Sequence, residues 1–536
     1  MHRRIAGISS VLALSVSAIA SGQTKQNNLV VKIDSGLVQG AHSPDYPNLD
    51  FFRGIPYAAP PIGELRWKPP RPPGRWLGVR KADELSPACP QSDGFFRIRQ
   101  RILTTLGGDP STARAMDKTS EACLYLNVMT MRPDRNERRP VMVFLHGGGG
   151  VMGRGDDAGA TLALGGAVVV TINYRLGVLG WLAHPALTAE SAQHSSGNYG
   201  LLDQIAALQW VHRNIAQFGG DRENVTIFGH SSGGEYAGCL MVSALARGLF
   251  QRAIMQSGVP LNLLPSVHHP GGEVEPAEKL GEKLAHTLET GEGPDALKRL
   301  RSIPAERLVN ESLPYDIVVD GWVLPDQPLA MFARGQQADI PVMAGSTERE
   351  FGNLIALFSD RSSEAYHAWV RRSFPPIADD VLRMYPAPPS GDATQSFIRA
   401  ATELQMIAPA RWLARSMLEK KNKAHLYQVT WAFDSKGGQE WGAFHGIDML
   451  LLFDSLAVPR DKAGDALAQV MRRYWIQFAK TGDPNAPGLT NWPTYDSTTG
   501  SYLDLGAEIR RGAALHEAAF VLIDRLYKTR FNATWP

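Results

Sequence analysis

The segment Val225–Gly234, which reads Val-Thr-Ile-Phe-Gly-His-Ser-Ser-Gly-Gly, constrains the fold more than any other part of the chain. Its β-branched and aromatic start predicts a short buried strand, and the helix-forming residues 235–246 predict a helix directly after it. The intervening Gly-x-Ser-x-Gly places Ser231 at the tip of a sharp turn, where bulkier residues at the glycine positions would clash. Such a turn exposes the serine hydroxyl, so Ser231 is a candidate nucleophile.

Further apolar runs predict the rest of a sheet. They are continuous rather than alternating, which indicates strands covered on both faces, and helical stretches such as 200–217 separate them. The expected strands are 140–145, 167–174, 225–228, 253–255, 340–344 and 424–430, with a hairpin from 29–33 and 37–40. This pattern predicts an α/β fold with a large, mostly parallel central sheet flanked by helices.

The chain organisation is predicted to be a signal peptide followed by one domain. Residues 1–22 combine a short basic start, an apolar run and small residues suited to cleavage, so we expect a secreted or periplasmic protein. Residues 23–536 contain long helical insertions at about 270–335 and 355–420, without low-complexity linkers, and we expect these to form a cap. A final helix is expected over 513–527.

Composition excludes some partners but leaves others open. The formal net charge of the 536 residues is +2, and Arg3 and Arg4 of the expected signal peptide account for it, so nothing indicates nucleic acid or an anionic membrane as a partner. After the signal segment no run has the length of a membrane span, so no stable membrane insertion is expected. The oligomeric state stays open.

A glycine run supplies candidate donors for an oxyanion. The expected strand 140–145 leads directly into His-Gly-Gly-Gly-Gly at 146–150. The run lacks the Lys-Ser/Thr of a phosphate-binding loop. Beside a nucleophile turn it predicts an oxyanion hole, for which we expect the backbone N–H groups of Gly148, Gly149 and Ser232.

A serine nucleophile also needs a base and an acid that orients it. His445 stands on a glycine-flanked loop soon after the expected strand 424–430. Two carboxylates, Glu348 and Glu350, follow the expected strand 340–344, and spacing alone leaves both open. The order Ser, Glu, His along the chain is that of the α/β-hydrolases.

Several long segments resemble the type-B carboxylesterases, the family that includes carboxylesterases, cholinesterases and bacterial para-nitrobenzyl esterases. The matching segments are 52–58, 120–128, 146–149, 173–177, 197–204, 229–233 and 479–485. The resemblance implies an α/β-hydrolase fold with a helical cap over an active-site gorge. It also implies hydrolysis of a small-molecule ester through an acyl-enzyme, without metal or organic cofactor.

The same resemblance assigns roles to individual residues. It implies a catalytic triad of Ser231, Glu350 and His445, with Glu348 as the alternative acid. It also implies a Cys89–Cys123 disulfide, in agreement with the loop-like segment that these cysteines enclose. The third cysteine, Cys239, stands among apolar residues and is expected to be buried.

Departures from the family bear on the substrate. The family usually has Glu before the nucleophile and Ala after it, where this chain has His230 and Ser232. No tryptophan lies between Cys89 and Cys123, which argues against a choline-type cationic substrate. That segment instead carries the basic residues Arg97, Arg99, Arg101, Arg114 and Lys118.

Arg154 and His230 are candidate substrate-binding residues. Arg154 follows the glycine run, and a guanidinium pairs well with a carboxylate. One hypothesis is therefore a polar or polycarboxylate ester, such as the tricarballylate esters of fumonisin-type toxins. The alternatives are a general carboxylesterase acting on short-chain or aromatic neutral esters, a non-catalytic cholinesterase-like binding protein, and a serine peptidase of the same fold.

Overall fold

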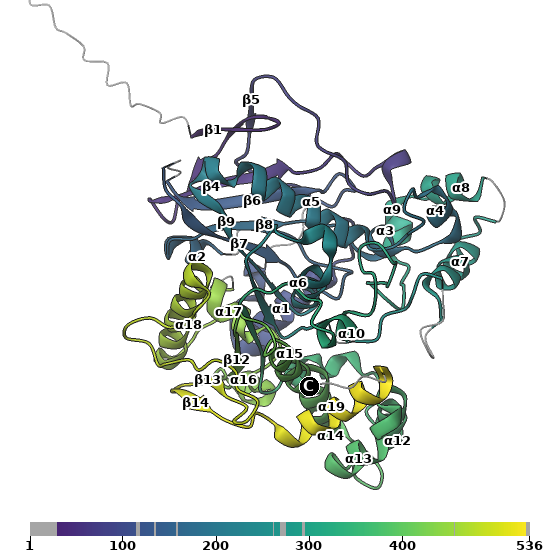
Figure 1. The fold of residues 1–536 in the computed structure, drawn as a ribbon, viewed down its shortest axis with the longest axis vertical. Helices are drawn as coiled ribbons and strands as arrows, with labels where there is room; N and C mark the ends of the chain where they lie inside the picture. Colours follow the sequence, from purple (N-terminus) through teal and green to yellow (C-terminus); the bar gives the residue numbers. More distant parts are fainter. Residues whose placement is uncertain are drawn as a thin grey trace, which may run out of the picture.

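The structure is a computed structural model that describes residues 29–113, 118–132, 136–156, 159–260, 262–268, 275–291, 295–454 and 456–531. The expected signal peptide and Arg114 lie outside these residues. Figure 1 shows a large twisted sheet surrounded by helices. No helix within the described ranges is both long and apolar enough to cross a membrane.

The sheet of eleven strands has the order β14-β13-β12-β11-β10-β9-β7-β8-β6-β4-β3. Neighbours from β8 to β13 pair in parallel, and the outer pairs are antiparallel. The strands of this sheet are β3 Ala41–His42, β4 Leu49–Pro56, β6 Tyr125–Met131, β7 Arg139–Leu145, β8 Val168–Ile172, β9 Gly220–His230, β10 Arg252–Gln256, β11 Val342–Thr347, β12 Ala424–Val429, β13 Tyr502–Leu505 and β14 Ile509–Gly512. The expected mostly parallel centre is therefore present.

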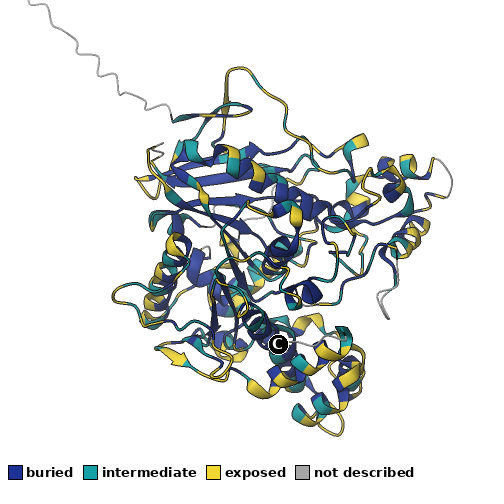
Figure 2. Cartoon of the chain, viewed as in Figure 1, coloured by how far each residue is buried: buried dark blue, intermediate teal, exposed yellow. Residues whose placement is uncertain are grey.

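The unbroken apolar strands are buried on both faces, as Figure 2 shows for the centre of the sheet. Because successive side chains of a strand point to opposite faces, β7 divides between two cores. Val141, Val143 and Leu145 join one core, and Met142 and Phe144 join the other. The first core contains α5 Tyr199–Asn214, α6 Ser232–Val242 and α15 Ala408–Ser416; the second contains α2 Ala160–Leu164, α17 Ile447–Phe453 and α18 Lys462–Thr481.

The described parts of both expected insertions contain helices. Helices α12, α13 and α14 of the second insertion gather with the C-terminal α19 at the lower end of Figure 1, and α7 and α8 of the first insertion lie at its right, beside α4. The remaining α-helices are α1 Gly94–Leu106, α3 Gly177–Trp181, α4 Pro185–Glu190, α7 Ala277–Thr287, α8 Ala296–Ser302, α9 Ala305–Val309, α10 Pro328–Ala333, α11 Phe351–Leu354, α12 Ser363–Ser373, α13 Ala378–Met384, α14 Thr394–Thr402, α16 Lys436–Trp441 and α19 Glu517–Phe531.

One local expectation is confirmed and extended, and two are corrected. The expected hairpin forms from β1 Val30–Ile33 and β2 Gly36–Gln39, but it also pairs with β5 Val79–Lys81 in a separate sheet. The segment between Cys89 and Cys123, expected to be loop-like, contains α1, because Leu103 and Leu106 lie on one helical face and are buried. The last helix begins at Glu517, four residues later than expected.

Candidate active site

The strand, turn and helix expected around Ser231 are present. Strand β9 ends at His230 and α6 begins at Ser232, so Ser231 alone makes the turn, with φ 57° and ψ −130°. A positive φ is strained for a residue with a side chain. A Cβ on Gly229 would lie 2.2 Å from the carbonyl oxygen of Gly233, which is the clash that the glycines avoid.

His445 and Glu350 are in direct contact. His445 Nδ1 lies 2.5 Å from Glu350 Oε2, and the other carboxylate oxygen accepts a 2.7 Å bond from the Thr347 N–H. Glu350 is fully buried, whereas Glu348 is exposed. The structure therefore brings Glu350 to the histidine, and sequence spacing could not have distinguished the two carboxylates. With Nδ1–H donating to Glu350, Nε2 keeps a lone pair and can act as a base.

His230 connects the turn to the histidine loop. Its ring centroid lies 4.4 Å from that of His445, and its Nε2 lies 4.0 Å from Oδ1 of the buried Asp448. Burial, with the charge of His445 adding to it, holds the pKa of His230 well below its ordinary value. Burial also raises the pKa of Asp448 to about 6, although a hydrogen bond from Gln256 opposes this. Sequence reasoning had not singled out Asp448.

The glycine loop reaches the start of α6. Gly148, Gly149 and Gly150 have φ values of 120°, 62° and 69°, which side-chain-bearing residues rarely adopt. The Gly149 N–H donates a 3.0 Å hydrogen bond to Ser232 Oγ. Of the three expected oxyanion donors, Gly149 is thus already engaged, by a side chain that the family does not usually have.

A cavity of about 450 Å³ opens beside the turn. Both expected insertions contribute to its wall, through 313–316 and 405–406. Its lining residues are Gly149, Val151, Ser231, Ser232, Glu235, Ser257, Gly258, Val259, Asn262, Leu313, Pro314, Tyr315, Asp316, Gln405 and Met406. The candidate nucleophile and two of the candidate oxyanion residues therefore face one space large enough for a small molecule.

Two carboxylic acids, Glu235 and Asp316, share this cavity. Burial raises the pKa of Glu235 to about 8, and the charge of Asp316 adds to the rise. Burial likewise raises the pKa of Asp316, although the Tyr236 hydroxyl donates a 2.6 Å hydrogen bond to it. The cavity consequently gains negative charge as Glu235 ionises near pH 8.

The candidate substrate-binding arginine lies elsewhere. Arg154 is not among the described residues that line this cavity, and its guanidinium donates a 3.2 Å bond to the Ser86 carbonyl. In the segment between the two cysteines, Arg97 pairs with Asp93 at 2.8 Å, and Arg101 lies over the ring of Trp441. Both arginines therefore have a partner within the chain.

The cysteines are arranged as expected. Cys89 and Cys123 are joined by a disulfide, and Cys239 is a buried free thiol on α6. Burial raises the pKa of Cys239 well above its ordinary value, so the thiol is not activated. No group of three or more His, Cys, Asp or Glu side chains in the described part of the chain could hold a metal ion.

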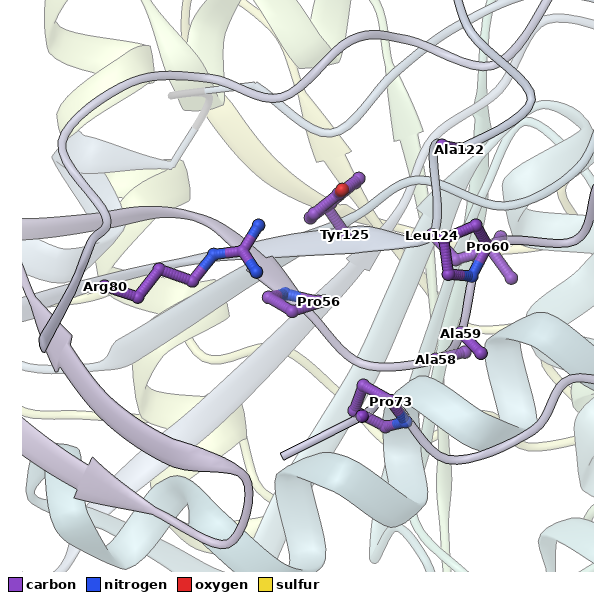
Figure 3. Close-up of a pocket in the computed structure, with 10 residues that line it drawn as sticks. Pro56, Ala58, Ala59, Pro60, Pro73, Arg80, Ala122, Leu124 and Tyr125 are labelled. Atoms are coloured by element: carbon purple, nitrogen blue, oxygen red, sulfur yellow. The ribbon is translucent and has the colours of Figure 1, made fainter. Parts of the chain in front are cut away.

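A second, smaller cavity of about 120 Å³ shares no lining residue with the first (Figure 3). Proline and alanine make up most of its wall, including Pro56, Pro60 and Pro73. Among its described lining residues only Arg80 and Tyr125 carry polar side chains, and the Arg80 guanidinium already lies over the Tyr125 ring, 5.9 Å from its centroid. This cavity contains no candidate nucleophile.

The sheet, the strained serine between β9 and α6, and the pair of His445 with the buried Glu350 together define an α/β-hydrolase. The chain belongs to the carboxylesterase family, whose model matches residues 27–521. It is a carboxylic ester hydrolase.

Individual relatives agree with this assignment. The chain is 32% identical to fumonisin B1 esterase of Sphingopyxis macrogoltabida, over 96% of this chain and 93% of the relative. It is also 32% identical to para-nitrobenzyl esterase of Bacillus subtilis, over 85% and 91% of the two chains. A solved structure of a PNB esterase superposes with a TM-score of 0.78 and 30% identity, covering 92% of this chain and all of the other.

Proposed function

We propose that this esterase works through Ser231, His445 and Glu350. The observation that carries the proposal is the 2.5 Å contact between His445 Nδ1 and Glu350 Oε2, because it fixes the tautomer that leaves Nε2 as the base. The contact of His230 with His445 supports it further, since His230 directly precedes Ser231.

The proposed reaction has two stages. His445 takes the Ser231 proton as Oγ attacks the ester carbonyl, and Glu350 stabilises the resulting imidazolium. The backbone N–H groups of Gly148 and Ser232 stabilise the oxyanion, aided by the N-terminus of α6, while the Gly149 N–H, the third expected donor, is bonded to Ser232 Oγ. His445 then protonates the leaving alcohol and activates the water that hydrolyses the acyl-enzyme.

Substitution of each triad residue tests this mechanism. Ser231→Ala should remove ester hydrolysis, and His445→Ala should lower kcat to a similar level, because residues that act as a unit are not additive. The double variant should then be no slower than either single variant. A Ser231→Ala enzyme with wild-type kcat would contradict the proposal.

For the substrate, we propose a polar ester, with carboxylate-bearing esters as the first class to test. The name of the Sphingopyxis relative, fumonisin B1 esterase, supports this choice. The acidic pair of the cavity, Glu235 and Asp316, favours the alternative, a neutral short-chain or aromatic ester.

A panel of matched neutral and dicarboxylate esters separates the two substrate classes. The quantity to compare is kcat/KM for each dicarboxylate ester divided by kcat/KM for its neutral match. If Arg154 binds a carboxylate, Arg154→Ala should lower kcat/KM for the dicarboxylate ester alone. An unchanged ratio would contradict that role.

We propose export of the protein, with residues 1–22 removed. The Cys89–Cys123 disulfide supports this, because disulfides persist in oxidising compartments. The N-terminal sequence of protein recovered from the periplasm or medium tests it. Recovery in the cytoplasm with residues 1–22 intact would contradict it.

A further inference from the structure

The hydroxyl of Ser232 accepts a hydrogen bond from the Gly149 N–H, one of the three backbone donors expected for the oxyanion hole. We propose that the Ser232 Oγ–H is itself a donor to the oxyanion and acts in place of the Gly149 N–H. Ser232 would then be a catalytic residue through its side chain as well as its backbone. The inference rests on the proposed function of Ser231.

The hydrogen bond between the two residues carries the argument. Gly149 N–H donates to Ser232 Oγ over 3.0 Å, and both residues line the cavity that contains Ser231. A hydroxyl that accepts one bond can still donate its own proton elsewhere. The Ser232 side chain is buried, and the residue is only 7% exposed, so solvent competes weakly for that proton.

The backbone of Ser232 supports the same role in binding the oxyanion. As the first residue of α6, Ser232 has an N–H without an intrahelical acceptor. One residue thus offers two donors, the N–H and the O–H, directly after the nucleophile. The positive end of the helix dipole adds to the stabilisation of negative charge there.

The glycine loop is tightly packed at Gly148. Three successive glycines hold left-handed backbone conformations, and a Cβ on Gly148 would lie 2.2 Å from the Met152 carbonyl oxygen. Gly148 is therefore closely packed, whereas a Cβ on Gly149 would meet no atom within 4 Å, so the direction of the Gly149 amide rests on its bond to Ser232 Oγ. A hydroxyl that accepts this bond is polarised and becomes a stronger donor itself.

The chemical step needs no additional reactant. The Ser231 Oγ–carbon bond forms while the carbonyl π pair moves to oxygen, and the Ser231 proton passes to His445. The Ser232 hydroxyl donates a hydrogen bond to this oxygen and keeps its proton throughout. Collapse of the intermediate restores the carbonyl and expels the alcohol.

Ser232→Ala, the residue usual in the family, tests the inference. We expect kcat to fall by about 10- to 100-fold with KM nearly unchanged, somewhat less than the loss of a whole donor because the Gly149 N–H becomes available. The rate of phosphonylation of Ser231 should fall in parallel. Wild-type or higher kcat in Ser232→Ala, or a change confined to KM, would overturn the inference.

Two further variants support this test. Ser243→Ala removes a buried hydroxyl at the other end of α6, outside the cavity, and should leave kcat unchanged. Ser232→Cys keeps the shape but has a weak donor, so its kcat should lie between those of wild type and Ser232→Ala. If Ser232→Ala fails to fold, wild-type kcat in Ser232→Cys would overturn the inference instead.

The same assays separate this inference from the proposed function. If the wild-type enzyme is not labelled by a phosphonate at Ser231, the proposed function fails and the inference fails with it. If wild type is labelled and Ser231→Ala is inactive, but Ser232→Ala equals wild type, the inference alone fails.

Discussion

The ring of His230 packs against the ring of His445, with centroids 4.4 Å apart and an interplanar angle of 45°. The residue before the candidate nucleophile thus restrains the candidate base. By its resemblance to the type-B carboxylesterases the chain would have a glutamate at this position, whereas it has the half-buried imidazole of His230, whose pKa burial holds well below its ordinary value, so that an uncharged ring stands there. This exchange has consequences for the pH dependence of the enzyme.

His230→Glu should move the acidic limb of the kcat/KM profile to higher pH by about one unit. An ionised carboxylate within a few ångströms favours the charged form of His445, so the neutral base is lost at higher pH. The matched neutral control is His230→Gln. Superimposable pH profiles for the two variants would show that charge at this position does not act on His445.

Glu350→Gln should lower kcat by about 10³- to 10⁴-fold, because the amide cannot stabilise the imidazolium or select the required tautomer. Glu348→Gln provides a matched control, since Glu348 is exposed and two residues away. Its kcat should stay within about twofold of wild type. Steady-state kinetics on one neutral ester are sufficient, and equal losses in both variants would contradict the assignment of Glu350.

The acidic pair of the cavity should make KM for an anionic ester depend on pH. Above the Glu235 pKa of about 8 the cavity holds more negative charge, so KM for a carboxylate ester should rise between pH 7 and 9. KM for its neutral analogue should stay flat. Glu235→Gln should remove the rise, and a rise that persists in that variant would place its origin elsewhere.

His425 should make the protein less stable in acid. It is buried on β12, and burial lowers its pKa to about 4. In the unfolded chain this histidine has a pKa near 6.5, so it binds a proton at a higher pH than it does in the folded protein. The contribution of neutral His425 to the free energy of unfolding is therefore complete above pH 6.5 and is lost as pH falls towards 4. The loss is on the order of 3 kcal/mol.

His425→Phe tests this contribution. Urea unfolding at pH 7.5 and pH 4.5 should show a smaller loss of unfolding free energy in the variant than in wild type. His146, whose pKa burial also lowers to about 4, is present in both proteins and cancels in the comparison. Equal losses would refute the assignment to His425.

Removal of the disulfide should destabilise the fold. Cys89 and Cys123 are 34 residues apart, and closing a loop of this length contributes about 3–4 kcal/mol. The Cys89→Ser/Cys123→Ser double variant should therefore unfold at lower urea concentration. A reductant should shift wild type towards the variant and leave the variant unchanged, whereas identical midpoints would show that the bridge adds no stability.

The sequence predicted those parts of the fold that follow from local patterns. Unbroken apolar runs located the central strands, and the glycines around Ser231 predicted the turn because only they fit its close contacts. Spacing within a single turn does not encode the burial that separates Glu350 from Glu348, and only the resemblance to the type-B carboxylesterases favoured Glu350 from the sequence.

Side-chain contacts between distant segments were beyond prediction. The bond from Gly149 to Ser232 joins residues 83 positions apart, and it depends on one side-chain rotamer. Arg154 follows the glycine run in sequence, yet its guanidinium reaches the Ser86 carbonyl instead of the cavity. Glu235 of α6 and Asp316 of the first insertion likewise share a cavity only in the folded protein, which sequence patterns do not show.

The most direct test of the account is peptide mass spectrometry after inhibition by a fluorophosphonate. We predict a single adduct, on Ser231, whose stoichiometry equals the fraction of esterase activity lost. Complete inhibition with the adduct on another residue, or full activity with Ser231 modified, would contradict the central claim that Ser231 is the nucleophile.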